Sequence, residues 1–149
     1  MIRDLNDREI KNVLSSQVLG RLACTDGKKP YIVPITYFFD GKYIYGQTNI
    51  GKKLRMLRKN PNVCFEVDML TDMFNWKSVL VFGEFEELKN EEAIVAKELL
   101  YNSIFSLMTG STVHPHEHGT VAGIDDKSRE KLVMYRIKIK SITGRLEKK

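Results

Sequence analysis

Two Asp-Gly pairs separate three β-like runs near the start of the chain, and they constrain the fold more than any other feature. The runs are Val18–Thr25, Pro30–Phe39 and Tyr43–Thr48, and the pairs between them are Asp26-Gly27 and Asp40-Gly41. Asp-Gly between two strands is a strong signal for a tight hairpin. Parallel pairing would need a helical crossover between consecutive strands, and these connections are too short for one. The sequence therefore predicts a three-stranded antiparallel meander.

The other elements follow from capping, periodicity and breaker signals. Asn6 and Glu9 have the spacing of a capping box, which predicts a first helix over residues 6–17. Amphipathic patterns predict a short helix over 51–59, which Asn60-Pro61 ends, and a longer helix over 91–109. Three further strands are expected at Val63–Asp68, Ser78–Leu88 and Lys131–Ile142, with 69–76 as a connection and 110–130 irregular. We expect a mainly β (α+β) fold, a six-stranded antiparallel barrel with flanking helices, in a single domain over 1–149.

Composition limits the class of protein. The 149 residues, 42% of them apolar, can build a core, and no run approaches the ~18 apolar residues of a membrane span. The start, Met-Ile-Arg-Asp, does not resemble a signal peptide. Cys24 and Cys64 lie in apolar runs without CxxC spacing, which is typical of reduced, buried thiols. These features lead us to expect a cytoplasmic protein.

The net charge of +5 is unevenly spread, with basic residues gathered at 52–59 and in the C-terminal tail. Nucleic acid is one partner for such a surface. However, the chain carries no helix-turn-helix, zinc-finger or aromatic RNA-binding signature. A small anionic ligand together with ordinary solubilising charge explains the bias more simply, and we do not expect a nucleic-acid partner.

The helix expected over 51–59 begins with positive charge, which a helix start disfavours. Lys52 and Lys53 lie in its first turn, at a cost of roughly 0.3–1 kcal/mol each from the helix dipole. A bound anion would make both favourable, because free backbone N–H groups and the ammonium groups would hold it together. Helical spacing turns Lys53 inward beside the apolar stripe and Lys52 toward solvent; the stripe is Ile50, Leu54 and Leu57. The pattern predicts a phosphate site, with a solvated basic helix as the alternative.

Pro34 interrupts the second β-like run. Because proline cannot donate to a ladder, the strand must have an edge, a bulge or a gap at this position. Neighbouring backbone groups would then be free to bind a ligand. A plain edge-strand proline that blocks aggregation is the alternative interpretation.

A series of short motifs covers about residues 18–90 and 131–146. They are Leu19-Gly20-Arg21-Leu22-Ala23, Pro30-Tyr31-Ile32-Val33-Pro34-Ile35, Ile44-Tyr45-Gly46-Gln47-Thr48, Gly51-Lys52-Lys53-Leu54, the run 58–68, Trp76-Lys77-Ser78-Val79, the run 82–88, Tyr135-Arg136-Ile137 and Thr143-Gly144-Arg145. Each motif is weak alone, but their order and spacing resemble the FMN-binding split-barrel family. The similarity is to its pyridoxamine 5′-phosphate oxidase-related branch, which includes the nitroimidazole-resistance proteins.

The resemblance implies a homodimer of split β-barrels with FMN in each of two clefts at the subunit interface. The FMN phosphate would bind at Gly51, Lys52 and Lys53, with Lys53 as the lysine of the motif and Thr48 as a further hydrogen-bond donor. The flavin ring would lie along Pro34, Ile35, Thr36 and Tyr37. Trp76, Lys77 and Ser78 of the partner subunit would cover it. Gln47, also expected at the cofactor, replaces a histidine that is common in this branch.

All three histidines lie in one short segment, as His114, His116 and His118. In an extended segment this period-two spacing would put three imidazoles on one side, an arrangement suited to zinc, nickel or copper. A loop that folds over the flavin cleft and an ordinary solvated loop are the alternatives. No metal site is assigned, and these residues are kept as a candidate.

The function implied by the resemblance is that of an FMN-dependent oxidoreductase, which passes electrons from reduced pyridine nucleotide to a small acceptor. No Cys–His, Ser–His or paired-carboxylate arrangement identifies a catalytic residue. A non-enzymatic flavin or haem carrier or redox sensor is the alternative. Nucleic-acid binding through the 52–59 helix is a third hypothesis.

Overall fold

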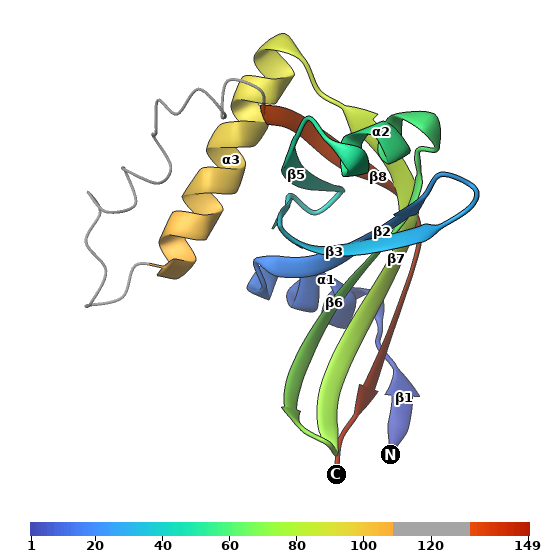
Figure 1. Ribbon diagram of the computed structural model, residues 1–149. Coiled ribbons are helices and arrows are strands. Elements are labelled where there is room, and N and C mark those ends of the chain that lie inside the picture. Colours follow the sequence, from blue (N-terminus) through green and yellow to red (C-terminus); the bar gives the residue numbers. More distant parts are fainter. Residues whose placement is uncertain (109–131) are drawn as a thin grey trace.

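The computed structural model describes residues 1–108 and 132–149, which form three helices around a curled sheet (Figure 1). In chain order the elements are β1 (Ile2–Asp4), α1 (Asp7–Ser16), β2 (Leu19–Thr25), β3 (Pro30–Thr36), β4 (Phe38–Phe39), β5 (Tyr43–Asn49), α2 (Lys52–Lys59), β6 (Asn62–Asp72), β7 (Asn75–Glu87), α3 (Asn90–Met108) and β8 (Leu132–Glu147). No helix within the described residues is long and apolar enough to cross a membrane.

The sheet is antiparallel throughout its described part and has the order β3-β2-β6-β7-β8-β5-β4, with β1 added along β8. The curled sheet and its flanking helices confirm the expected split-barrel class. The expected number of six strands is wrong, since the described residues form eight. One added strand is the short β1, and the other arises because the run Pro30–Phe39 breaks into β3 and β4 at Tyr37.

Both Asp-Gly turns form as expected. Gly27 and Gly41 have a φ of 98°, which glycine adopts without strain. In each turn the aspartate side chain accepts two backbone N–H bonds, Asp26 from Lys28 and Lys29 and Asp40 from Lys42 and Tyr43. The first turn joins β2 to β3, and the second joins β4 to β5.

The prediction of a continuous three-stranded meander is wrong, because the middle strand changes partner at Tyr37. This side chain is fully buried, packs edge-on against Phe65 with 4.9 Å between ring centroids, and donates its hydroxyl hydrogen to the Leu14 carbonyl at 2.7 Å. Its backbone N–H donates to the Val18 carbonyl, so it also ends the β2–β3 ladder. Anchoring Tyr37 in the core turns the chain away, and β4 pairs with β5 instead of extending β3. As a result β3 and β5 are not paired with each other.

Residues 69–76 are not the expected connection. They form the far end of a long β6–β7 hairpin, in which Leu70 pairs with Trp76, and this hairpin projects away from α2 (Figure 1). Asp72 shapes the turn by accepting bonds from the Phe74 backbone N–H and from the Asn75 side chain. Strand β8 likewise continues beyond the expected end at Ile142, to Glu147, because it pairs with β7 along the same arm. Long-range pairing therefore extends both strands past their local signals.

The helices α1 and α2 cover one core cluster, and α3 covers a second, smaller one. Helix α1 carries the complete capping box between Asn6 and Glu9. In α2, Leu54 and Leu57 are fully buried, but Ile50 is 57% exposed, so the expected stripe is wrong at that position. Ile50 precedes the first helical residue, and Met56 is buried instead.

Gly46 permits a close approach in the middle of β5. A Cβ atom at this position would lie 2.6 Å from the hydroxyl oxygen of Tyr135 on β8. Tyr135 is fully buried, and its ring fills the space in which a side chain at position 46 would stand. This contact brings β5 and β8 together next to the site described below.

Candidate functional site

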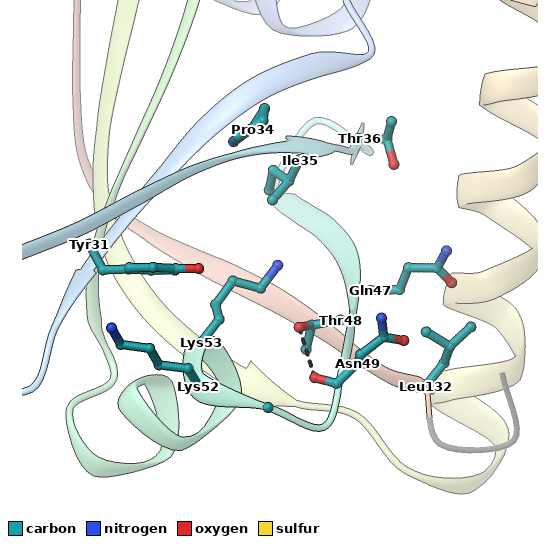
Figure 2. A pocket seen from close by; sticks show the side chains of 11 residues that line it. Tyr31, Pro34, Ile35, Thr36, Gln47, Thr48, Asn49, Lys52, Lys53 and Leu132 are labelled. Carbon is teal, nitrogen blue, oxygen red and sulfur yellow. Dashed lines mark hydrogen bonds between the residues drawn. The ribbon is translucent and has the colours of Figure 1, made fainter. Parts of the chain in front are cut away.

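A cavity of about 430 Å³ lies where β3 and β5 face each other, beside the start of α2 (Figure 2). Its lining residues are Tyr31, Pro34, Ile35, Thr36, Gln47, Thr48, Asn49, Gly51, Lys52, Lys53 and Leu132. Strand β3 ends the sheet, and β4 pairs only with Ile44 and Tyr45 of β5, so residues 47–49 extend beyond it. The cavity therefore lies between two strand edges that the partner change at Tyr37 leaves without a hydrogen-bonded strand among residues 1–108 and 132–149. Pro34 lies on such an edge, where its missing N–H removes no ladder bond.

Lys53 points into this cavity from the first turn of α2 (Figure 2). Its side chain is half-buried, and burial lowers the pKa of its ammonium group, an effect that the neighbouring Cys24 thiol partly opposes. Within residues 1–108 and 132–149, no carboxylate pairs with Lys53. The cavity therefore contains a partly desolvated cation that the described part of the protein leaves unneutralised.

Lys52 is exposed and lies over the ring of Tyr31, with 5.4 Å between its ammonium nitrogen and the ring centroid. The two lysines thus separate as their helical spacing indicates, since Lys53 points inward and Lys52 lies at the rim. Together they make the mouth of the cavity positive, and no acidic residue lines it among the described residues.

The start of α2 adds backbone donors to the two lysines. The capping residue is Gly51, and no side chain caps the helix. First-turn N–H groups of an α-helix have no partner within the helix and carry its positive dipole end. The neighbouring Thr48 is buried, and its hydroxyl donates to the Asn49 carbonyl at 3.1 Å. That hydroxyl would have to release Asn49 before it could donate to a ligand.

Gln47 lies at the other side of the cavity and is held by helix α3. The Tyr101 hydroxyl donates to Oε1 of Gln47 at 3.0 Å. Side chains alternate along β5, so Gln47 shares with Tyr45 the face on which α3 packs, whereas Thr48 points into the barrel. Figure 2 shows the Gln47 side chain pointing toward α3 at the edge of the cavity.

Four of the expected cofactor residues are not among those that line the cavity. The Tyr37 side chain is in the core, as described above. Trp76, Lys77 and Ser78 lie on the projecting end of β7, whereas the other end of this strand contacts α2 through the Glu87–Arg58 ion pair at 2.8 Å. At about 3.3 Å per residue, Trp76 is roughly 35 Å along the strand from that end. These three residues therefore lie away from the cavity of their own chain.

The projecting end has its own polar contact and hollow surface. The Trp76 indole N–H donates to the Glu147 carboxylate at 2.9 Å. One hollow is lined by Trp76 with Ser78 and Gly144, among others, and a second by Trp76 with Lys77 and Leu146, among others. Trp76 is therefore a partly exposed aromatic side chain at a concave surface, and no described residue covers it fully.

The sequence interpretation missed four residues of the site. Tyr31 could have been predicted from the strand period, because it lies four residues before Ile35 and therefore shares its face of β3. Asn49 and Leu132 line the cavity, and Tyr101 reaches it through Gln47; their positions follow from tertiary contacts alone. The candidate metal ligands His114, His116 and His118 lie outside the described residues. Within those residues no cluster of metal-binding side chains occurs.

Comparisons with known proteins agree with this architecture. A crystal structure of an FAD-binding protein from Mesorhizobium loti has a TM-score of 0.79 and 29% identity, covering 100% of this chain and 98% of that one. A candidate 5-nitroimidazole antibiotic resistance protein from Bacteroides thetaiotaomicron has a TM-score of 0.73 and 16% identity, over 98% and 87% of the two chains, and shows the fold alone. An uncharacterized protein of Rhizobium meliloti (strain 1021) is 37% identical over 87 residues, which span 58% of each chain.

The sequence profile described as "Pyridoxamine 5′-phosphate oxidase" matches residues 6–146, which include the elements from α1 to α3 and all of β8 except its last residue. The match covers the described lining of the cavity, the strands β3 and β4 on either side of Tyr37, and the projecting β6–β7 hairpin. The chain belongs to the pyridoxamine 5′-phosphate oxidase family.

Proposed function

We propose that this protein is an FMN-binding flavoprotein in which the cavity between β3 and β5 holds the cofactor. Lys53 and the first-turn N–H groups of α2 would hold the phosphate. Backbone groups on the unpaired edges of β3 and β5 would hold the ring, with Ile35 and Tyr31 offering apolar surface. The FAD-binding neighbour from Mesorhizobium loti supports a flavin as the ligand class.

One observation carries the proposal: a half-buried ammonium group points into a cavity where no described carboxylate neutralises it. Burying a charge is costly unless it is paired. A bound anion would pair with the Lys53 ammonium group and so offset this cost. At a helix start the anion would also interact favourably with the helix dipole and accept hydrogen bonds from the free N–H groups. A terminal phosphate meets all of these conditions.

The chemistry would be oxidation and reduction. When bound, a flavin supplies the redox chemistry, and the protein binds it, orients it and tunes its electronic properties. We propose that reduced pyridine nucleotide donates the electrons and that a small molecule accepts them. The described lining residues contain no acid–base pair, and the role that we propose for them is to bind and position the cofactor.

The proposal includes a homodimer. Trp76, Lys77 and Ser78 lie too far along β7 to reach the cavity of their own chain. Strand β7 is rigidly paired on both sides, with β6 and β8, so it can present these residues to another subunit without rearranging. A second copy of this chain would therefore complete the site.

Titration of the cofactor-free protein with FMN, riboflavin and FAD tests the ligand. Riboflavin lacks the phosphate and would lose the contacts with both Lys53 and the first-turn N–H groups, so we expect it to bind at least about ten- to a hundredfold more weakly than FMN, the loss expected for one charge-assisted hydrogen bond alone. Mass identification of the flavin released from the purified protein gives an independent answer. Equal affinity for FMN and riboflavin would contradict the phosphate site, and tighter binding of FAD would assign the site to that cofactor instead.

Stopped-flow oxidation of NADH and NADPH tests the activity. The FMN-loaded protein should oxidise at least one of them faster than free FMN does. Oxidation no faster than with free FMN, by a protein that does bind the cofactor, would reject the oxidoreductase and favour a flavin carrier.

A further inference from the structure

We propose that Tyr101 of α3 is a positioning residue for the flavin, acting through Gln47. Its hydroxyl holds the Gln47 amide so that the amide N–H group is available to donate a hydrogen bond to an acceptor atom on the pyrimidine part of the bound ring. This inference rests on the proposed function and adds a residue that lies 54 positions from Gln47 in the sequence.

The Gln47 amide has two polar ends, the carbonyl oxygen Oε1 and the amino group at Nε2. Oε1 accepts the Tyr101 hydroxyl hydrogen at 3.0 Å, which fixes the rotation of the amide plane. A glutamine side chain has two N–H donors, both on Nε2. Within residues 1–108 and 132–149, no acceptor bonds Nε2. Gln47 lies at the edge of the cavity and is one of its lining residues, so the unbonded Nε2 is the polar group of this side chain that can donate to a ligand there.

The position of Tyr101 is itself fixed by packing. Its ring belongs to the small core under α3, and the ammonium group of Lys97 lies 5.6 Å from the ring centroid. The same core contains Leu100, which is fully buried and neighbours it on the helix. Tyr101 is thus a rigid donor, and Gln47, which would otherwise choose among several rotamers, is held in one of them.

A donor at this position has a predictable effect on a flavin. The ring accepts hydrogen bonds at N5 and, on its pyrimidine part, at N1 and the two carbonyl oxygens, and negative charge on the pyrimidine part increases on two-electron reduction. A fixed N–H donor to the pyrimidine part therefore stabilises the reduced form more than the oxidised form and raises the reduction potential. Without the donor, the preference for the reduced form should fall about two- to tenfold, the value of one neutral hydrogen bond.

The test compares the midpoint potentials of FMN bound to four variants. Tyr101→Phe removes only the hydroxyl group, and we expect a potential lower by about 10–30 mV, since a tenfold change is about 30 mV for two electrons. Gln47→Leu should give a similar decrease, and the double variant should show no further one. Tyr45→Phe is the matched control, because it removes a hydroxyl bond of the same 3.0 Å length, to Asp40, outside the cavity lining. Its potential should equal that of the wild-type protein.

The outcomes separate this inference from the proposed function. If the wild-type protein does not bind FMN, both are overturned. Two results would overturn only the inference, provided that the wild-type protein binds FMN. One is a Tyr101→Phe variant with an unchanged potential. The other is a Tyr101→Phe substitution that lowers the potential of Gln47→Leu by as much as it lowers the potential of the wild-type protein. If Tyr101→Phe does not fold, Gln47→Glu decides the matter: it keeps an oxygen acceptor for Tyr101 and removes the N–H donor, so the potential should fall at least as much as in Gln47→Leu.

Discussion

Replacing Lys53 with methionine should affect the protein in opposite directions with and without its ligand. Methionine keeps an unbranched side chain of similar length and removes the charge. In the ligand-free protein the ammonium group is partly desolvated without an ion partner among the described residues, so its removal should raise the free energy of unfolding. In the proposed complex with FMN the same charge would hold the phosphate, so its removal should weaken binding.

The effect on binding can be estimated from the environment of Lys53. One charge-assisted hydrogen bond in a half-buried site contributes about 1.5–3 kcal/mol, so the Kd for FMN should rise about ten- to a hundredfold. At an FMN concentration of 100 times the wild-type Kd, the ligand stabilises the wild-type protein by about 2.7 kcal/mol. It would stabilise Lys53→Met by about 1.4 kcal/mol for a tenfold loss and about 0.4 kcal/mol for a hundredfold loss. Urea denaturation with and without FMN measures both quantities.

The pH dependence gives a second check on the ligand-free protein. The folded-state pKa of Lys53 lies below the ordinary value of 10.5. Between these two values the unfolded chain binds more protons than the folded protein, so stability rises with pH. The stability advantage of Lys53→Met should therefore be full below the folded pKa and shrink as the pH approaches 10.5. An advantage that is constant or grows with pH would refute the desolvation argument.

Lys52→Met is the matched control for the binding measurement. Lys52 lies in the same helical turn but is exposed, and exposed charge pairs contribute about 0–1 kcal/mol, or at most about fivefold in Kd. Equal losses of FMN affinity in the two variants would show that helical position does not decide which lysine binds the phosphate.

Three further predictions concern other parts of the protein. Gly46→Ala should lower the free energy of unfolding by about 1–3 kcal/mol, because its Cβ would overlap the buried Tyr135 hydroxyl; an unchanged urea midpoint would mean that the ring moves freely. The hydrogen bond from Arg3 lowers the pKa of Glu9 from 4.5 to about 2, so its contribution to stability should be lost as the pH falls from 4.5 to 2. Unfolding curves of Glu9→Gln and the wild-type protein at pH 6 and pH 2 should therefore converge at the lower pH; a constant gap would contradict the pair. If Trp76 covers the flavin of a second subunit, dilution to monomer followed by gel filtration should release FMN, and a monomer that retains it would exclude this role.

The features that could be predicted from the sequence depend on residues close together in the chain. The capping box of Asn6 and Glu9 and the turns at Asp26-Gly27 and Asp40-Gly41 are local hydrogen-bond patterns. The inward direction of Lys53 follows from its place in the helical turn relative to Leu54 and Leu57. For these elements the chemistry of a few neighbouring residues determines the conformation, and the antiparallel class of the sheet follows from the short connections.

The partner change at Tyr37 could not be predicted in this way. A tyrosine in a β-like run is ordinary in sequence, and what breaks the strand is a hydrogen bond to Leu14 and a contact with Phe65, both distant in the chain. That break leaves two strand edges without a paired strand in the part of the chain that the structure describes, and the cavity lies between them. The long arm of β6 and β7 is similar, because pairing with β8 extends both strands through residues that look like a connection.

By itself, then, the amino-acid sequence determined the tight turns, the helix starts and the positive charge at the start of α2, since each depends on short-range geometry. Only the tertiary structure decided where the barrel opens, that Trp76 lies about 35 Å along β7 from the end that contacts α2, and that Tyr101 holds Gln47. These outcomes depend on which distant surfaces pack together, and the free energy of that packing is a property of the whole core.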